Sequence, residues 1–187
     1  MAALFWQFLF YSFSGFLLEV AYARLSRTAK QDRKCHLLLP VCPVYGIGGL
    51  LLGLLPGSVT TSPFLLFLMG AAVCTAAEWG MSLFYEKAAR TAFWDYSALP
   101  WNLGGRVCLL FSFAWGLLAL PVTYVIQPHL SRWSSGVPSG ITLFAALLYL
   151  ADAAFSLYLL RRGGTDSLLW YRRVPGFRLF SAHRAYH

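Results

Sequence analysis

Charged side chains are scarce in this chain: Asp, Glu, Lys and Arg make up 12% of its 187 residues, against 58% hydrophobic residues. A soluble globule of this length needs more polar side chains to cover its surface, so the composition excludes the ordinary soluble class and indicates a membrane protein. Acidic residues are especially few, seven against fifteen Lys and Arg, which gives a formal net charge of +8. Because basic residues beside apolar segments usually mark membrane orientation, we expect no nucleic-acid partner.

Several motifs are also missing. The four cysteines, Cys35, Cys42, Cys74 and Cys108, form no Cys-x-x-Cys pair, and the four histidines are scattered, so we expect reduced thiols, no metal site and no cofactor. The chain opens without a basic segment followed by a cleavage site, so we expect its first apolar run to remain as a membrane span. It contains no Walker A motif, so ATP hydrolysis would need a separate subunit.

Five apolar runs organise the chain, at residues 2–23, 37–55, 63–85, 107–126 and 140–160. A helix needs about 20 residues to cross a hydrocarbon core about 30 Å thick. The sequence therefore predicts an all-α, polytopic membrane protein with five transmembrane helices over residues 1–162. Residues 163–187 form a basic, aromatic tail, which we expect to lie on anionic lipid headgroups in the cytoplasm.

Prolines and glycines modify this pattern. Pro40 and Pro43 open the second run, and proline biases the preceding residue toward extended backbone, so we expect irregular chain here before a helix begins. Gly49 and Gly53 follow at a spacing suited to close helix contact. A new helix could begin at Pro100, and residues 127–138 are predicted to form a loop.

The distribution of Lys and Arg predicts the orientation. With the N-terminus outside, the inside segments contain five, two and six Lys or Arg residues, whereas the outside segments contain none and one. The positive-inside rule therefore predicts an outside N-terminus and a cytoplasmic C-terminus. A re-entrant second run would place the arginine-rich tail outside, so we interpret that run as a full crossing.

Three of the runs contain an acidic residue, Glu19, Glu78 or Asp152. Each lies on a helix face of small and polar residues, and the predicted topology puts all three at similar depths near the cytoplasmic end. An ionisable group at membrane depth costs about 2.5–3.5 kcal/mol. Arg106 is the expected partner for one of the acids. The others could share protons, become neutral through desolvation or bind a cationic ligand, or they could hydrogen-bond to neighbouring helices.

The stretch 93–108 combines acid, amide, guanidinium, thiol and indole groups between the third and fourth runs. We expect it to close over the layer of acids and form a cytoplasm-facing polar vestibule. The candidate substrate- or proton-binding residues are Glu19, Cys42, Tyr45, Glu78, Asp95, Tyr96, Asn102, Arg106, Ser112 and Asp152. Two simpler interpretations stay open. Asp95 could cap an interfacial turn, and the cysteines could be small buried hydrophobic residues.

Several motifs recur together in a known family. They are Pro40-Val-Cys-Pro-Val-Tyr-Gly, Trp94-Asp-Tyr-Ser and Asn102-Leu-Gly-Gly-Arg, with Glu19, Glu78 and Trp115-Gly. In these motifs the chain resembles the bacterial type IV ABC-transporter permease family over roughly residues 5–160. The resemblance implies a multi-pass transport component of a bacterial plasma membrane.

The sequence is compatible with three functions, and it does not decide whether the protein is an enzyme. The first is a permease-like subunit that lies in the lipid bilayer and works with a separate nucleotide-binding subunit. The second is a membrane-embedded enzyme that acts on a lipid-like substrate from the cytoplasmic side. In it Glu78 or Asp95 would be the general base, and Arg106 with Asn102 would hold an anionic headgroup. The third is a non-catalytic membrane scaffold.

Overall fold

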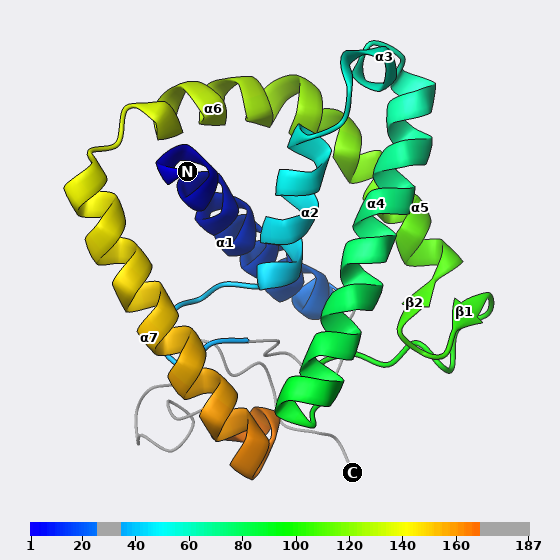
Figure 1. The fold of residues 1–187 in the computed structure, drawn as a ribbon. Coiled ribbons are helices and arrows are strands. Elements are labelled where there is room, and N and C mark those ends of the chain that lie inside the picture. The colour runs from blue at the N-terminus through cyan, green and yellow to red at the C-terminus, as the bar shows by residue number, and fades with distance from the viewer. Residues whose placement is uncertain (26–34, 169–187) are drawn as a thin grey trace.

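A computed structural model describes residues 1–25 and 35–168 of the protein, and helices make up most of them (Figure 1). The helices are α1 (Ala2–Leu25), α2 (Pro43–Gly53), α3 (Gly57–Thr60), α4 (Pro63–Phe84), α5 (Leu109–Pro121), α6 (Gln127–Ser135) and α7 (Ser139–Gly163). π-helical turns follow α4 at Tyr85–Ala89 and α5 at Val122–Ile126, and a 3₁₀ turn, Thr165–Leu168, follows α7. Two short strands, β1 (Asn102–Leu103) and β2 (Val107–Cys108), form a hairpin.

Within residues 1–25 and 35–168, four helices are long and apolar enough to cross a membrane. They are Ala2–Leu25, Pro63–Ala89, Leu109–Ser135 and Ser139–Gly163. These correspond to the first, third, fourth and fifth predicted spans. The all-helical membrane class is thus confirmed, with four of the expected spans present as long helices.

The second predicted span, 37–55, contains only the short helix α2, Pro43–Gly53. Its 11 residues extend about 16 Å at 1.5 Å per residue, about half of a hydrocarbon core. The predicted irregular chain before it is present, because no helix begins until Pro43. In Figure 1 the chain rises through α2 from the end of the bundle where α1 ends to the end where α3 lies.

The fourth long helix is bent and continues beyond its predicted end at residue 126. Pro121 closes α5, a π-helical turn follows, and α6 then continues to Ser135. Sharp helix bends are typical of prolines and π-bulges. Figure 1 shows α6 lying across the end of the bundle where α1 begins. The prediction of a loop at 127–138 is therefore wrong for most of its length, because Gly136 is the first residue there that breaks the helix.

Residues 90–108 contain no helix, so the prediction of a helix start at Pro100 is also wrong. β1 and β2 pair antiparallel instead, with Leu103 opposite Val107. Gly104 and Gly105 both have positive φ, 59° and 70°, and the Arg106 N–H donates to the Leu103 carbonyl at 3.2 Å. Two such residues in succession favour a tight hairpin turn, and glycine adopts this backbone without steric cost.

Glycine contacts bring α2 close to α1. A Cβ on Gly49 would lie 2.3 Å from the Tyr11 ring, and one on Gly15 would lie 2.1 Å from the Tyr45 ring. The expectation that Gly49 serves close helix contact is confirmed, whereas Gly53 faces the amide of Gln127. Because α2 can approach α1 this closely, the Tyr45 side chain reaches the centre of the bundle.

Part of the predicted basic surface lies outside the described residues. It comprises the connection at 26–34, with four of the five predicted loop cations, and the tail at 169–187. The position of the tail on lipid headgroups therefore stays a prediction.

Candidate functional site

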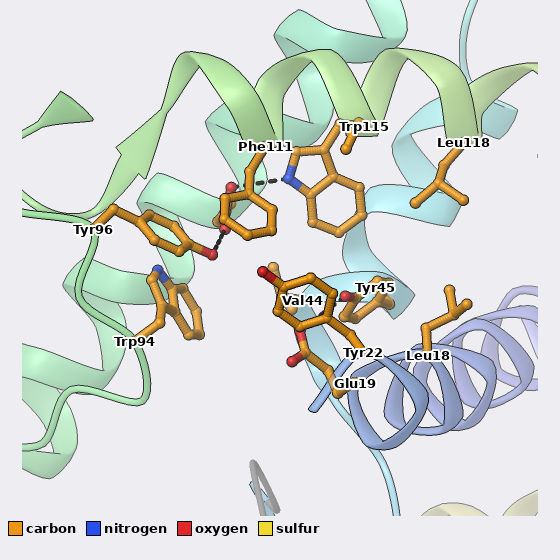
Figure 2. Close-up of a pocket in the computed structure, with 12 residues that line it drawn as sticks. Leu18, Glu19, Tyr22, Val44, Tyr45, Trp94, Tyr96, Phe111, Trp115 and Leu118 are labelled. Carbon is orange, nitrogen blue, oxygen red and sulfur yellow. Dashed lines mark hydrogen bonds between the residues drawn. The ribbon is translucent and has the colours of Figure 1, made fainter. Parts of the chain in front are cut away.

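A cavity of about 250 Å³ opens between α1, α2, α4, α5 and the segment after α4 (Figure 2). Its aromatic lining consists of Tyr22, Tyr45, Trp94, Tyr96, Phe111 and Trp115. Two carboxylates, those of Glu19 and Glu78, also line it. It lies near the end of the bundle where α1 and α4 end and α5 begins. Side chains far apart in the sequence thus surround one space.

Glu78 is held by two neutral donors. Its side chain is buried on α4, and the Tyr96 hydroxyl donates to its Oε1 at 2.9 Å. The Trp115 indole N–H, from α5, donates to its Oε2 at 2.9 Å. Both carboxylate oxygens therefore accept a hydrogen bond, and the acid ties the segment after α4 and helix α5 to α4.

Glu19, on α1, lies across the cavity from Tyr96 and Trp115, the two residues that donate to Glu78 (Figure 2). The Tyr45 hydroxyl, from α2, donates to its Oε1 at 2.9 Å. The Tyr45 ring lies against the Trp115 ring, with centroids 4.9 Å apart. Trp115 in turn donates to Glu78, so contacts between polar and aromatic groups run from one carboxylate to the other.

Residues 93–108, which end in the β1–β2 hairpin and are called here the hairpin stretch, supply two residues of the cavity, Trp94 and Tyr96. Polar groups within this stretch stabilise its turns. The Asp95 Oδ1 accepts from the Ser97 N–H at 2.9 Å, an Asx-type turn. Asn102 donates to the Leu99 carbonyl at 2.7 Å and accepts from the Gly105 N–H at 3.0 Å. Neither Asp95 nor Asn102 is among the residues that line the cavity. Their observed role is to shape the turns that follow Trp94 and Tyr96.

Arg106 differs from its expected role as the partner of an intramembrane acid. Its guanidinium forms an ion pair with Glu86, on the π-helical turn after α4. Both side chains are substantially exposed, 29% and 55%. The Arg106 carbonyl accepts from the Trp94 indole at 2.8 Å. The observed acidic partner of Arg106 is therefore Glu86, just after the end of α4, and not one of the acids that the sequence suggested.

Asp152 is not among the residues that line the cavity, so the three acids do not share this one space. Its carboxylate, on α7, accepts from the backbone N–H groups of Leu38 and Leu39 at 3.0 and 2.9 Å. The His36 ring nitrogen Nδ1 is 3.5 Å away, and the Ser156 hydroxyl accepts from the Leu37 N–H at 2.8 Å. Asp152 thus anchors the irregular chain before α2 to α7.

Cys42 and Ser112 also lie outside the cavity lining. Cys42 is buried, and its N–H donates to the Ser12 carbonyl at 2.9 Å. Ser112 accepts from the Thr75 hydroxyl at 2.8 Å and donates to the Cys108 carbonyl at 3.1 Å. These residues join neighbouring helices, and all four cysteines are buried and form no disulfide.

The structure adds aromatic residues that the sequence did not mark as site residues: Tyr22, Trp94, Phe111 and Trp115. A signal for them exists. Phe111 and Trp115 are four residues apart on α5, and Glu19 and Tyr22 are three apart on α1, so each pair shares one helix face. Tyr22 and Phe111 meet edge to face across the cavity, with centroids 6.0 Å apart.

A family model matches residues 6–157, a region that contains every residue of the cavity. A search of the curated proteins gave no significant match, and a search of the solved structures gave none either. The matched region covers most of the chain, including its four long apolar helices almost completely. This multi-pass membrane protein therefore belongs to the family described as "Putative ABC-transporter type IV".

Proposed function

We propose that this protein is the membrane component of a transport system in a bacterial plasma membrane, and that the cavity around Glu19 and Glu78 is its substrate site. One observation carries the proposal. Two carboxylates on different helices face one aromatic-lined cavity inside a bundle of apolar helices. Ionisable groups at membrane depth are costly, and they usually mark substrate or proton pathways.

The proposal includes five crossings with the N-terminus outside. The direction of the chain in Figure 1 supports this count, because α1, α2, α4, α5 and α7 alternate in direction. Charge supports the orientation, since α1, α4 and α7 run toward the same end of the bundle in Figure 1, and Arg24, Lys87 and Arg161 lie at or just after the ends of these helices. The connection at 54–62, at the other end, is uncharged. By the positive-inside rule the cavity then opens toward the cytoplasm.

A separate nucleotide-binding subunit completes the proposed system. The sequence lacks the glycine-rich loop that holds ATP phosphates, so this chain needs a partner for ATP hydrolysis. The partner would contact the cytoplasmic ends of the helices, close to the cavity.

The enzyme hypothesis has less support. It needed Asp95 or Glu78 as a base, with Arg106 and Asn102 to hold an anionic headgroup. Asp95 and Asn102 bond within the hairpin stretch, and Arg106 pairs with Glu86. The observed contacts therefore support the transport hypothesis more than the enzyme hypothesis.

Purification of the full chain from its native membranes in a mild detergent tests the proposal. We expect a protein with a Walker A motif to co-purify in a stoichiometric amount, together with ATPase activity. A preparation without such a subunit that chemically alters a bound lipid would contradict transport and favour the enzyme.

Matched variants then test the cavity. Glu78→Gln removes a cavity carboxylate with little change in shape, whereas Glu86→Gln makes the same change on an exposed side chain of the same helical segment. We expect Glu78→Gln to abolish transport-coupled ATPase activity and Glu86→Gln to retain it. Full activity in a Glu19→Gln/Glu78→Gln double variant would leave only the scaffold role.

A further inference from the structure

Exposed apolar side chains gather on the β1–β2 hairpin and at the start of α5. Trp101 is 81% exposed and Leu103 is 66% exposed, and Leu109 and Leu110 are exposed beside them. We call these four residues the hairpin surface. Figure 1 shows the hairpin extending outward from the bundle beside α5. A group of exposed apolar side chains marks an interaction surface.

The backbone of Trp101 is held in a conformation that bulky residues rarely adopt. Its φ is 56°, in the left-handed region, which is unfavourable for any residue with a large side chain. The Leu109 N–H donates to the Trp101 carbonyl at 3.1 Å, and this bond fixes Trp101 beside the first turn of α5. Strained backbone persists only where its surroundings maintain it, and it is common at functional sites. The exposure of the Trp101 indole therefore belongs to a defined local structure.

The position of the hairpin surface identifies the lipid bilayer as its partner. Leu109 begins a helix that is long and apolar enough to cross a membrane. Leu109 and Phe113 are four residues apart and both exposed, so they lie on one lipid-facing side of that helix. Trp101 lies level with the first turn of this side, which makes the hairpin surface its continuation. Tryptophan is enriched at this depth because its indole has an apolar body and a polar N–H group.

Charged groups lie beside the hairpin, at the level expected for lipid headgroups. The Arg106 guanidinium, in the hairpin turn, pairs with Glu86 on the π-helical turn after α4. Lys87 and Arg90, on and just after that turn, are exposed. Basic side chains near a membrane surface attract anionic lipid groups. The hairpin thus lies between a charged rim and the apolar side of α5, as an element at the membrane interface does.

The hairpin turn also holds two residues of the cavity. The Gly105 carbonyl accepts from the Tyr96 N–H at 2.7 Å, and the Arg106 carbonyl accepts from the Trp94 indole at 2.8 Å. A Cβ on Gly105 would lie 2.6 Å from the Asp95 Oδ1, so the turn packs directly on the segment that carries both aromatic residues. A displacement of the hairpin would therefore displace part of the cavity wall.

We propose that the hairpin surface binds the interfacial region of the bilayer, and that this contact positions Trp94 and Tyr96 in the cavity wall. The ligand is the glycerol and upper acyl-chain region of phospholipids, which apolar and indole groups recognise without regard to headgroup charge. The inference does not rest on the transport role, because it needs only a multi-pass membrane protein.

Fluorine NMR of the full chain in phosphatidylcholine nanodiscs tests the proposal. Fluorotryptophan labels the 7 Trp residues, and the signal that disappears in Trp101→Phe is assigned to Trp101. A phosphatidylcholine with a nitroxide near the top of one acyl chain broadens the signals of groups at the interface. A water-soluble gadolinium chelate broadens the signals of groups in water. We expect the nitroxide lipid to remove the Trp101 signal and the gadolinium chelate to leave it unchanged.

Two matched double variants test the effect on the cavity wall. Trp101→Ser/Leu103→Ser removes two apolar side chains of the hairpin surface. Leu54→Ser/Phe64→Ser makes a similar change at the other end of the bundle, where both side chains are also exposed. We expect the first variant to shift the Trp94 signal, which Trp94→Phe assigns, and the second to leave it unchanged. Unshifted signals from the remaining tryptophans identify variants that fold, and the comparison of the two broadening agents on the unmodified chain needs no variant.

A Trp101 signal that the gadolinium chelate removes and the nitroxide lipid leaves unchanged would overturn the proposal, because the hairpin would then lie in water. A signal that survives both agents would also overturn it, because another protein chain, such as a second copy, would then cover the hairpin surface. An unshifted Trp94 signal in the Trp101→Ser/Leu103→Ser variant would refute the positioning of the cavity wall. Failure of the proposed function is distinguishable from these outcomes, since co-purification of an ATPase subunit tests it separately.

Discussion

Removal of the Asp152 carboxylate should release the irregular chain before α2. The carboxylate accepts two hydrogen bonds, from the backbone N–H groups of Leu38 and Leu39. A hydrogen bond to a charged group contributes about 1.5–3 kcal/mol to stability. We take the lower value for each bond, because the freed N–H groups reach solvent once the segment opens. Asp152→Ala should therefore lower the free energy of local opening by about 3 kcal/mol, which is about a 150-fold increase in the open fraction.

The rate at which a maleimide modifies Cys35 measures this opening. Cys35 directly precedes the anchored segment and is 6% exposed, so it should react mainly from the open state. The other cysteines are replaced by alanine, so that only the Cys35 thiol reacts with the maleimide. We expect Asp152→Ala to react about 150-fold faster than the parent. Asp152→Asn should react about tenfold faster, because the amide retains one acceptor oxygen.

Two control variants test whether loss of the Asp152 carboxylate is the cause of faster Cys35 labelling. Ser156→Ala removes the bond from the Leu37 N–H, together with the bonds that the Ser156 hydroxyl donates to the Asp152 carbonyl and carboxylate, and leaves the two N–H bonds to Asp152 in place. It should therefore accelerate Cys35 labelling only about fivefold. Asp95→Ala removes a different carboxylate that also accepts a backbone N–H, and it should leave Cys35 labelling unchanged. If Asp152→Ala reacts within twofold of the parent, the carboxylate does not hold this segment and the reasoning is refuted.

Two further predictions concern packing and surface charge. Gly49→Ala should destabilise the protein by about 1–3 kcal/mol because its Cβ would lie 2.3 Å from the Tyr11 ring. Gly80→Ala should stabilise it by about 0.5–1 kcal/mol, because nothing lies within 4 Å of the added Cβ. Unfolding in mixed detergent and SDS compares the two, and equal effects would contradict the packing argument. A double-mutant cycle on Arg106 and Glu86 should give less than about 1 kcal/mol in the same assay, because Glu86 is exposed and Arg106 is partly exposed. A larger coupling would mean that the pair is shielded from solvent.

The sequence alone determined the class of the protein and much of its helical pattern. Apolar runs of about 20 residues predicted four of the long helices, because a backbone in lipid must satisfy its hydrogen bonds internally. Pro40 and Pro43 predicted the irregular chain before α2, since proline fixes φ and removes a donor. Neither α6 nor the hairpin was predicted, although the Gly104-Gly105 pair is a local signal for a tight turn.

Position along the chain gives an expected depth for each acid, but it does not give the neighbours of the acid. Depth follows from 1.5 Å of rise per residue, so Glu19, Glu78 and Asp152 were placed at similar levels. Which acids face the same space depends on helix order and rotation, which the tertiary structure decides. The close approach of α2 to α1 brings Tyr45 to Glu19, and the hairpin stretch brings Tyr96 to Glu78.

Asp152 shows most clearly that the sequence alone does not reveal the neighbours of a buried acid. The sequence marks it as a costly acid inside an apolar helix, but it cannot reveal that two backbone N–H groups more than 110 residues earlier in the chain satisfy it. Tertiary packing therefore decided that Glu19 and Glu78 share a cavity while Asp152 anchors a connection. An acid's solvation depends on the groups that surround it in space, and these come from distant parts of the chain.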